Sequence, residues 1–139
     1  MKLSTRCRYG TRLMLDLAQH YGEGPVQIGD IAKRQAISVK YLEQILIPLK
    51  KAGFVVSVRG SRGGHLLGCA PEKITVGAIV VLLDGGLSFV ECVDHPEACD
   101  RSQDCLTRQV WSEALEAMYE KLESTTLWDL VQRGKSCGV

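Results

Sequence analysis

The chain has 139 residues, of which 45% are hydrophobic, so it can form one compact domain with a core and is not globally disordered. Its formal net charge of +1 conceals an asymmetry. Residues 1–73 contain 12 Lys and Arg against 5 Asp and Glu, whereas residues 74–139 contain 5 against 11. The halves therefore carry +7 and −6, and the basic half is predicted to contact a polyanion; ordinary scatter of surface charge is the alternative.

No secretion signal is recognisable, because the polar start of the chain lacks an apolar core segment. The longest purely apolar stretch, residues 78–83, is too short to span a bilayer. We therefore expect a cytoplasmic protein that does not contact a membrane. Since cytosolic thiols are kept reduced, the six cysteines are expected to be metal ligands or redox groups rather than disulfides.

Three helices are predicted in the basic half. Apolar spacing indicates a first helix over residues 4–21, with an inner face formed by Tyr9, Leu13, Leu17 and His20. A second helix is predicted over residues 28–34 and a third over 39–52, where Ser38 is a suitable N-cap. Pro48 lies inside the third helix and predicts a kink there.

Two short β-strands are predicted next, over residues 54–58 and 65–67. The turn between them, residues 59–64, contains three glycines, which permit positive φ and close approach of the backbone. Three helices followed by a basic, glycine-rich hairpin are typical of a winged helix-turn-helix. We expect this DNA-binding region to cover residues 1–74.

The acidic half, residues 75–139, is predicted to consist of a helix over 76–83 that Thr75 caps, a loop over 87–105 (the cysteine loop), a long helix over 106–123 and a last short helix that ends near Arg133. The fold class is thus mainly α with a small β-hairpin. Four apolar residues of the long helix recur at a/d spacing and predict a homodimer interface, with packing inside one subunit as the alternative. They are Trp111, Leu115, Met118 and Leu122.

The third helix has the length that fits the major groove of double-stranded DNA, and its N-terminal side chains would reach the base edges. The candidates are Ser38, Lys40, Tyr41, Glu43 and Gln44. Gln44 can bond adenine through two hydrogen bonds. Glu43 is repelled by phosphates unless it accepts from a cytosine amino group; a solvated helix charge is the alternative.

Two arginines of the turn, Arg59 and Arg62, are candidates for a narrow minor groove, where the negative potential is enhanced. A plain surface turn is the alternative. Because a symmetric dimer contacts two half-sites, the expected operator is an imperfect palindrome.

Three cysteines of the cysteine loop, Cys92, Cys99 and Cys105, are separated by six and five residues. Structural zinc sites usually have tight Cys-x-x-Cys pairs, which this loop lacks, so the spacing favours an iron–sulfur cluster. Three unliganded thiols are the alternative. A fourth ligand stays open among five residues: His95, Arg108, Cys7, Cys69 and Cys137.

Four segments together resemble one family: residues 2–5 with Arg8 and Tyr9, residues 37–44, residues 58–64 and the loop cysteines. The chain resembles IscR-like members of the IscR/NsrR/CymR family of winged helix-turn-helix transcription regulators. The resemblance implies a homodimer with a 2Fe–2S cluster in each subunit, whose occupancy selects DNA sites and controls iron–sulfur biogenesis genes, with repression among its roles. It also implies that Glu43 and Gln44 contact bases and that Arg59 enters the minor groove.

The sequence departs from the IscR pattern at one position, because Arg108 stands where that pattern has a histidine ligand. In NsrR-like proteins a side chain near the N-terminus of the other subunit completes the site. The corresponding position here is Arg8, and Cys7 is adjacent to it. We therefore expect the partner subunit's Cys7 to be the fourth ligand.

Other functions compete with this interpretation. A nitric-oxide or redox sensor of the NsrR kind would also bind DNA, as would a cluster-free repressor of cysteine metabolism of the CymR kind. Catalysis is not expected, since the three histidines, His20, His65 and His95, lie on separate elements without a nucleophile–base spacing.

Overall fold

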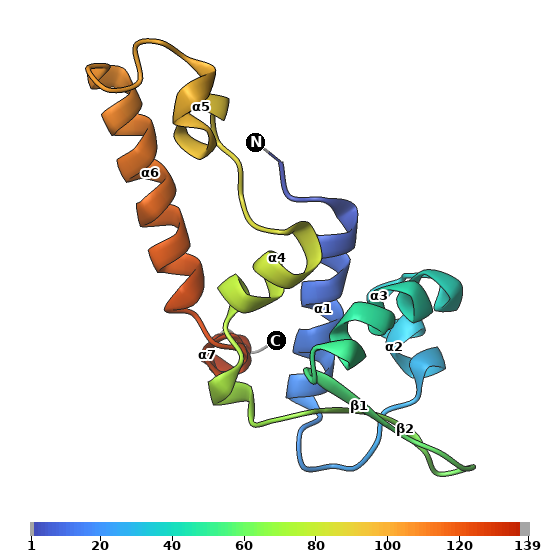
Figure 1. The fold of residues 1–139 in the computed structure, drawn as a ribbon. Helices are drawn as coiled ribbons and strands as arrows, with labels where there is room; N and C mark the ends of the chain where they lie inside the picture. Colours follow the sequence, from blue (N-terminus) through green and yellow to red (C-terminus); the bar gives the residue numbers. More distant parts are fainter. Residues whose placement is uncertain (1, 137–139) are drawn as a thin grey trace.

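The computed structural model describes residues 2–136 and is mostly helical (Figure 1). The predicted fold class, mainly α with one β-hairpin, is confirmed. Cys137, one of the candidates for a fourth ligand, lies outside the described residues. In chain order the elements are α1 (Thr5–Gln19), α2 (Ile28–Gln35), α3 (Val39–Lys51), β1 (Val55–Val58), β2 (Gly64–Leu67), η1 (Pro71–Lys73), α4 (Val76–Asp84), α5 (Glu91–Asp94), η2 (Pro96–Ala98), α6 (Leu106–Glu123) and α7 (Leu127–Ser136).

Side-chain caps fix where three of the helices begin. The Ser38 hydroxyl accepts from the backbone N–H of Tyr41, and the Thr75 hydroxyl accepts from that of Ala78, so both predicted N-caps are confirmed. Ser4 caps α1 in the same way, by accepting from the N–H of Cys7. Each cap satisfies a donor that the first helical turn leaves free and so anchors the start of the helix.

The core lies where α1 packs against α3 and α4. The predicted inner face of α1 is buried at Leu13 and Leu17, and it meets Ile45 of α3 and Ile79 of α4 in one cluster. Gly10 permits the close approach of α1 to α4, since a Cβ there would lie 2.3 Å from Leu83 Cδ1. Helix α3 continues through Pro48 to Lys51. The kink expected there stays a prediction.

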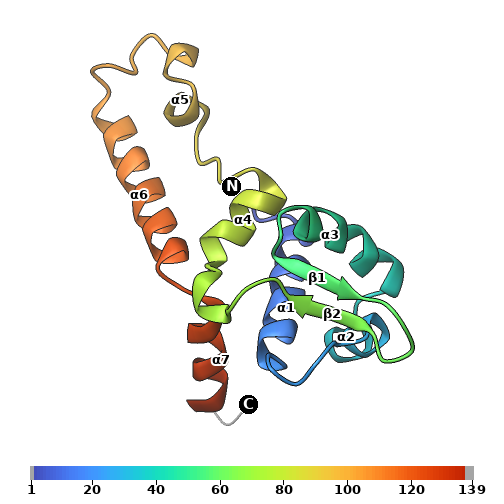
Figure 2. The same cartoon turned by 60° about the horizontal axis from the view of Figure 1, so that its bottom comes forward.

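The hairpin, hereafter the wing, pairs β1 with β2 in antiparallel register, from Val55 opposite Leu67 to Val58 opposite Gly64. Figure 2 shows it lying across α1 beside α3. The His65 backbone also pairs with Val26, with N–O distances of 2.8 and 2.9 Å, which ties the wing to the segment before α2. Glycine is required at the turn, because a Cβ on Gly63 would lie 2.0 Å from the Val58 carbonyl oxygen.

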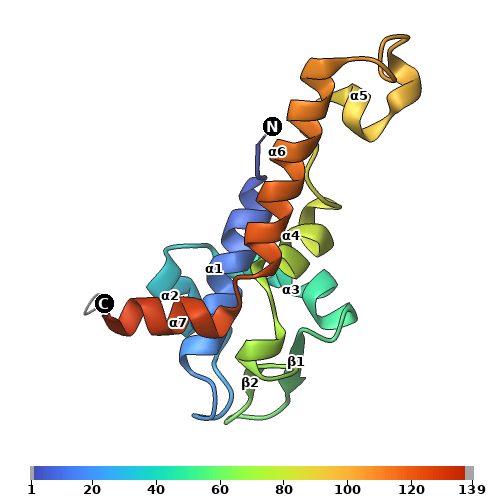
Figure 3. The same cartoon turned by 90° about the vertical axis from the view of Figure 1, so that its left-hand side faces the viewer.

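Helix α6 extends away from the winged region, with α5 at its far end and α7 following its near end (Figure 3). It packs on α4 and α5. The cysteine loop, predicted to be irregular throughout, contains the short helices α5 and η2, so that prediction was wrong in part. For η2 the cause is local: Pro96 starts a helical turn readily because its φ is already fixed near the helical value. Among the described residues, no helix is both long and apolar enough to cross a membrane.

Candidate nucleic-acid interface and cysteine loop

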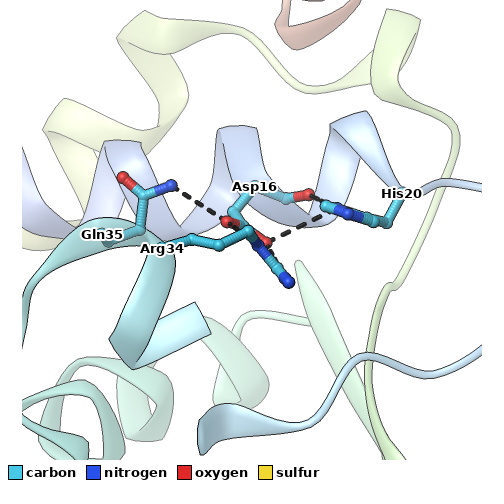
Figure 4. A network of polar contacts seen from close by, with 4 residues as sticks. All are labelled: Asp16, His20, Arg34 and Gln35. Atoms are coloured by element: carbon cyan, nitrogen blue, oxygen red, sulfur yellow. Dashed lines mark hydrogen bonds and ion pairs between the residues drawn. The ribbon is translucent and has the colours of Figure 1, made fainter. Parts of the chain in front are cut away.

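An ion pair between a buried carboxylate and a partly exposed arginine joins α1 to α2 (Figure 4). Asp16 is 1% exposed and accepts two hydrogen bonds from Arg34, at 2.7 and 3.0 Å, and one from Gln35 at 2.9 Å. His20 Nδ1 lies 2.8 Å from the backbone carbonyl oxygen of Asp16. Because Arg34 and Gln35 form the last turn of α2, these bonds fix the angle at which the helix-turn-helix leaves α1.

The environment of Asp16 favours the ionised carboxylate. Burial by itself would raise the pKa of Asp16, but the hydrogen bonds from Arg34 and Gln35 and the positive charge of Arg34 outweigh it, so the pKa is lowered. Sequence reasoning did not identify this residue. The available signal was a carboxylate on the apolar face of the first helix, one turn from Leu13 and adjacent to Leu17.

Four of the five predicted base-contacting residues of α3 are exposed: Ser38, Lys40, Glu43 and Gln44. The hydroxyl of Ser38 is already used as the N-cap of α3. Tyr41 is half-buried and packs edge-on against Tyr9 of α1, with ring centroids 5.8 Å apart. Three long polar side chains of the first two turns, those of Lys40, Glu43 and Gln44, therefore remain available to a ligand.

The wing places both of its arginines, Arg59 and Arg62, in exposed positions at the turn. This turn is tied to the rest of the fold by Gln27, whose side-chain amide donates to the Ser61 carbonyl at 3.3 Å. His65 lies on β2 with its Nδ1 3.0 Å from the Ser57 hydroxyl on the facing strand. The wing therefore has a fixed base and a charged, accessible end.

The structure does not bring the predicted metal ligands together. Cys92 and Cys105 are half-buried and Cys99 is exposed, and the described residues include no group of three or more His, Cys, Asp or Glu placed to hold a metal ion. The Cys105 thiol differs from an ordinary one. Its sulfur lies 3.2 Å from the Thr107 hydroxyl, and this hydrogen bond, followed by the backbone N–H of Arg108, lowers the pKa of Cys105.

Cys7 has the opposite environment. It is 1% exposed, in the first turns of α1. Burial, followed by the negative charge of Asp84, raises the pKa of Cys7 to about 11. In this conformation the thiol is protonated and enclosed by its own subunit, which weighs against its acting as a thiolate ligand.

The remaining candidates for a fourth ligand are also separate from one another. Cys69 is half-buried just after the wing, and exposed His95 lies 3.4 Å from the Glu97 carboxylate. Arg108 is half-buried beside the cysteine loop.

The predicted dimer stripe on α6 is partly used within the subunit. Leu115 is 8% exposed and belongs to the core, and Met118 and Leu122 pack against that core. Trp111 remains 40% exposed and meets Phe89 edge-on at 6.1 Å between ring centroids. Two further apolar side chains on the N-terminal half of α6 are exposed, Leu106 at 75% and Val110 at 54%.

Comparison with known sequences decides the family. Residues 3–133 match the sequence model of the Rrf2 family, described as iron-dependent transcriptional regulators. The chain belongs to the Rrf2 family. It is 49% identical to the protein rrf2 of Nitratidesulfovibrio vulgaris over 137 residues, covering 99% of this chain and 91% of that protein.

Two solved structures show the same fold as this Rrf2-family chain. CymR, the global cysteine regulator of B. subtilis, is 40% identical with a TM-score of 0.83, and the match covers 96% of this chain and 98% of that one. IscR of T. potens is 40% identical with a TM-score of 0.82, and the match covers 100% and 92%. The relatives are transcriptional regulators rather than enzymes, which confirms the expectation of a non-catalytic role. The winged region is therefore that of an Rrf2-type, DNA-binding transcriptional regulator.

Proposed function

We propose that this regulator binds an imperfectly palindromic operator as a homodimer, with α3 in the major groove and the wing in the adjacent minor groove. The observation that carries the proposal is the joint exposure of Lys40, Glu43 and Gln44 on α3 and of Arg59 and Arg62 on the wing. Gln44 would contact adenine, Glu43 would accept from cytosine, and Arg59 would enter the minor groove. Lys40 and Arg62 would contact phosphates, which positions the protein without specifying sequence.

Salt dependence of binding tests this arrangement. Each subunit carries five exposed cations on α3 and the wing: Lys40, Lys50, Lys51, Arg59 and Arg62. We expect about four of them to neutralise a phosphate. Eight phosphate contacts per dimer would give a slope of log affinity against log salt of about −7. Fluorescence anisotropy with a labelled duplex measures this slope, and Arg59→Ala is expected to make it shallower by about 2, because two contacts per dimer are lost.

The matched control is Arg133→Ala, which removes an exposed arginine from α7, outside the winged region, and should leave the slope unchanged. Failure to bind duplexes of any sequence at low salt, in both the iron-free and the iron-loaded protein, would reject the proposal. Equal slopes for Arg59→Ala and the unmodified protein would reject the role of the wing alone.

We further propose that residues 75–139 provide the sensor and the dimer contact, and residues 1–74 the DNA contact. In each subunit an iron–sulfur centre, of the 2Fe–2S type, would be held by Cys92, Cys99 and Cys105. When bound, the centre would supply a signal that depends on iron supply and redox state. The partner subunit's Cys7 stays the proposed fourth ligand, although the burial of Cys7 requires the first turn of α1 to open.

The donor chemistry of the loop fits such a centre. Thiolates are the usual ligands of iron–sulfur clusters, and the hydrogen bonds to Cys105 favour its thiolate form. The Ser102 hydroxyl oxygen in the same loop is buried and has no hydrogen-bond partner among the described residues. An unpaired buried hydroxyl costs roughly 1–3 kcal/mol. The unpaired hydroxyl of Ser102 therefore supports the binding of a further group at this loop.

Iron and acid-labile sulfide analysis tests the centre. Protein purified without oxygen is expected to contain about two iron and two sulfide per chain, with visible absorbance. Cys99→Ser should lower both, because it removes one of the proposed thiolate ligands. Cys99 is exposed, so its replacement should not disturb the core. An unchanged spectrum in Cys7→Ala would exclude Cys7 from the site.

A cluster-free cysteine regulator is the second candidate, because the CymR structure matches this chain as well as the IscR structure does. Anaerobic protein without iron would favour it. A nitric-oxide or redox sensor would instead be purified with iron, and its visible absorbance would be lost when nitric oxide or an oxidant is added.

A further inference from the structure

One side chain, that of Arg108, contacts the backbone on both sides of the cysteine loop. Arg108, in the first turn of α6, donates through Nε to the backbone carbonyl of Cys92 at 2.8 Å. Its Nη1 lies 3.5 Å from the carbonyl oxygen of Ser102. The two carbonyls are ten residues apart along the chain, so the guanidinium bridges the two sides of the loop.

Ser102 extends this connection to the third cysteine. Its backbone N–H donates to the Cys99 carbonyl at 3.2 Å. Ser102 is 6% exposed, although the residues around it, from Asp94 to Asp104, are exposed. Cys105 is the N-cap residue of α6, three positions before Arg108. Each cysteine segment is thus joined to Arg108 directly, through Ser102, or through the first turn of α6.

We propose that Arg108 is a positioning residue that holds the three cysteine segments of the loop in one conformation before any metal binds. This inference rests on the proposed function of the loop as a metal sensor. Arginine suits the role because its planar guanidinium carries several donors in a fixed geometry and can satisfy two carbonyls at once. Arg108 does not ligate the metal. It would instead order the loop and place a permanent positive charge beside thiols that become anionic when they bind metal.

Opening of the loop in iron-free protein is the direct readout. Trypsin cleaves after Arg101, which is exposed and adjacent to Ser102. Cleavage needs local unfolding, so its rate follows the population of the open loop when opening is fast. Arg108→Gln removes the charge-assisted bonds and is expected to raise the rate of cleavage after Arg101 about tenfold.

Two further variants separate bridging from charge. Arg108→Lys keeps the charge but loses the planar fork, and an intermediate cleavage rate is expected. Arg133→Gln removes an equal charge from exposed α7 and should leave cleavage after Arg101 unchanged. The thermal midpoint should not change in any variant, because the loop lies outside the core that α1 forms with α3 and α4.

Metal loading is the second readout, because a loop whose three cysteine segments are not held in one conformation should take up iron and sulfide less readily. At limiting iron and sulfide, Arg108→Gln should show several-fold less visible absorbance per chain than the unmodified protein, and Arg108→Lys should recover part of it. Equal cleavage rates in Arg108→Gln and the unmodified protein would overturn the role of Arg108, whatever the iron content. An unmodified protein that takes up no iron would overturn the proposed centre but leave the cleavage comparison valid.

Discussion

Replacing Asp16 with alanine is expected to lower the free energy of unfolding by about 2 kcal/mol. Loss of one partner from a buried, hydrogen-bonded pair costs roughly 3–5 kcal/mol. The cost here is smaller because the Arg34 side chain is 39% exposed, so water can solvate it once the carboxylate is gone. Urea denaturation followed by circular dichroism measures the change. DNA affinity should also fall, since Asp16 sets the angle between α1 and α2.

The same pair should make stability depend on pH. The pKa of Asp16 is lowered in the folded protein, so its stabilising contribution is complete above the unfolded-state value of about 3.9 and declines as the pH falls through the folded value. Asp16→Ala should lose this part of the acid dependence. Glu23→Ala removes an exposed carboxylate from the segment between α1 and α2 and is the control, expected within about 0.5 kcal/mol of the unmodified protein. Equal unfolding free energies for the two variants would contradict a stabilising role of the pair.

Trp111→Asp is expected to weaken the dimer at least a hundredfold. In an interface on α6, the carboxylate would be buried without a partner, once per subunit, which costs several kcal/mol in total. Analytical ultracentrifugation over a range of concentrations measures the dissociation. The resulting monomer keeps only half of the phosphate contacts, so the salt slope of DNA binding should become shallower, from about −7 to about −4.

A closely matched control exists on α7. Trp128 is 37% exposed, against 40% for Trp111. The Lys135 ammonium lies 5.5 Å from the centroid of its ring. Trp128→Asp should leave the dimer intact. If Trp128→Asp dissociates the dimer and Trp111→Asp does not, the subunits meet through α7 and the proposed α6 interface is wrong.

Much of the winged region followed from local sequence signals. The bounds of α2 and α3 agree with prediction within one residue, because Ser38 caps α3 and the apolar positions recur at helical spacing. The wing was predictable as well, since a run rich in β-branched residues, Val55, Val56 and Val58, precedes a turn whose glycines leave few other conformations. Both signals act within a few residues of the chain and need no tertiary information.

Residues of the α1–α2 junction and the cysteine loop were less predictable. Asp16 resembles any polar residue of an amphipathic helix until Arg34 and Gln35, 18 and 19 residues away, are brought onto it. In the sequence, Arg108 was notable only as a departure from the IscR pattern and as one of five candidates for a fourth ligand. Its two carbonyl partners became visible only once the loop was folded back on α6.

The sequence alone determined the longer helices and the two strands, their order, the exposed polar face of α3 and the charged turn of the wing, because helical periodicity, caps and glycine turns are local properties. Only the tertiary structure decided which apolar residues of α6 face the core, as Leu115 does, and which stay exposed, as Leu106 and Val110 do. It also decided that Cys7 is enclosed while Cys99 is accessible. Burial and thiol pKa depend on which distant segments pack together, and that information is spread over the whole chain.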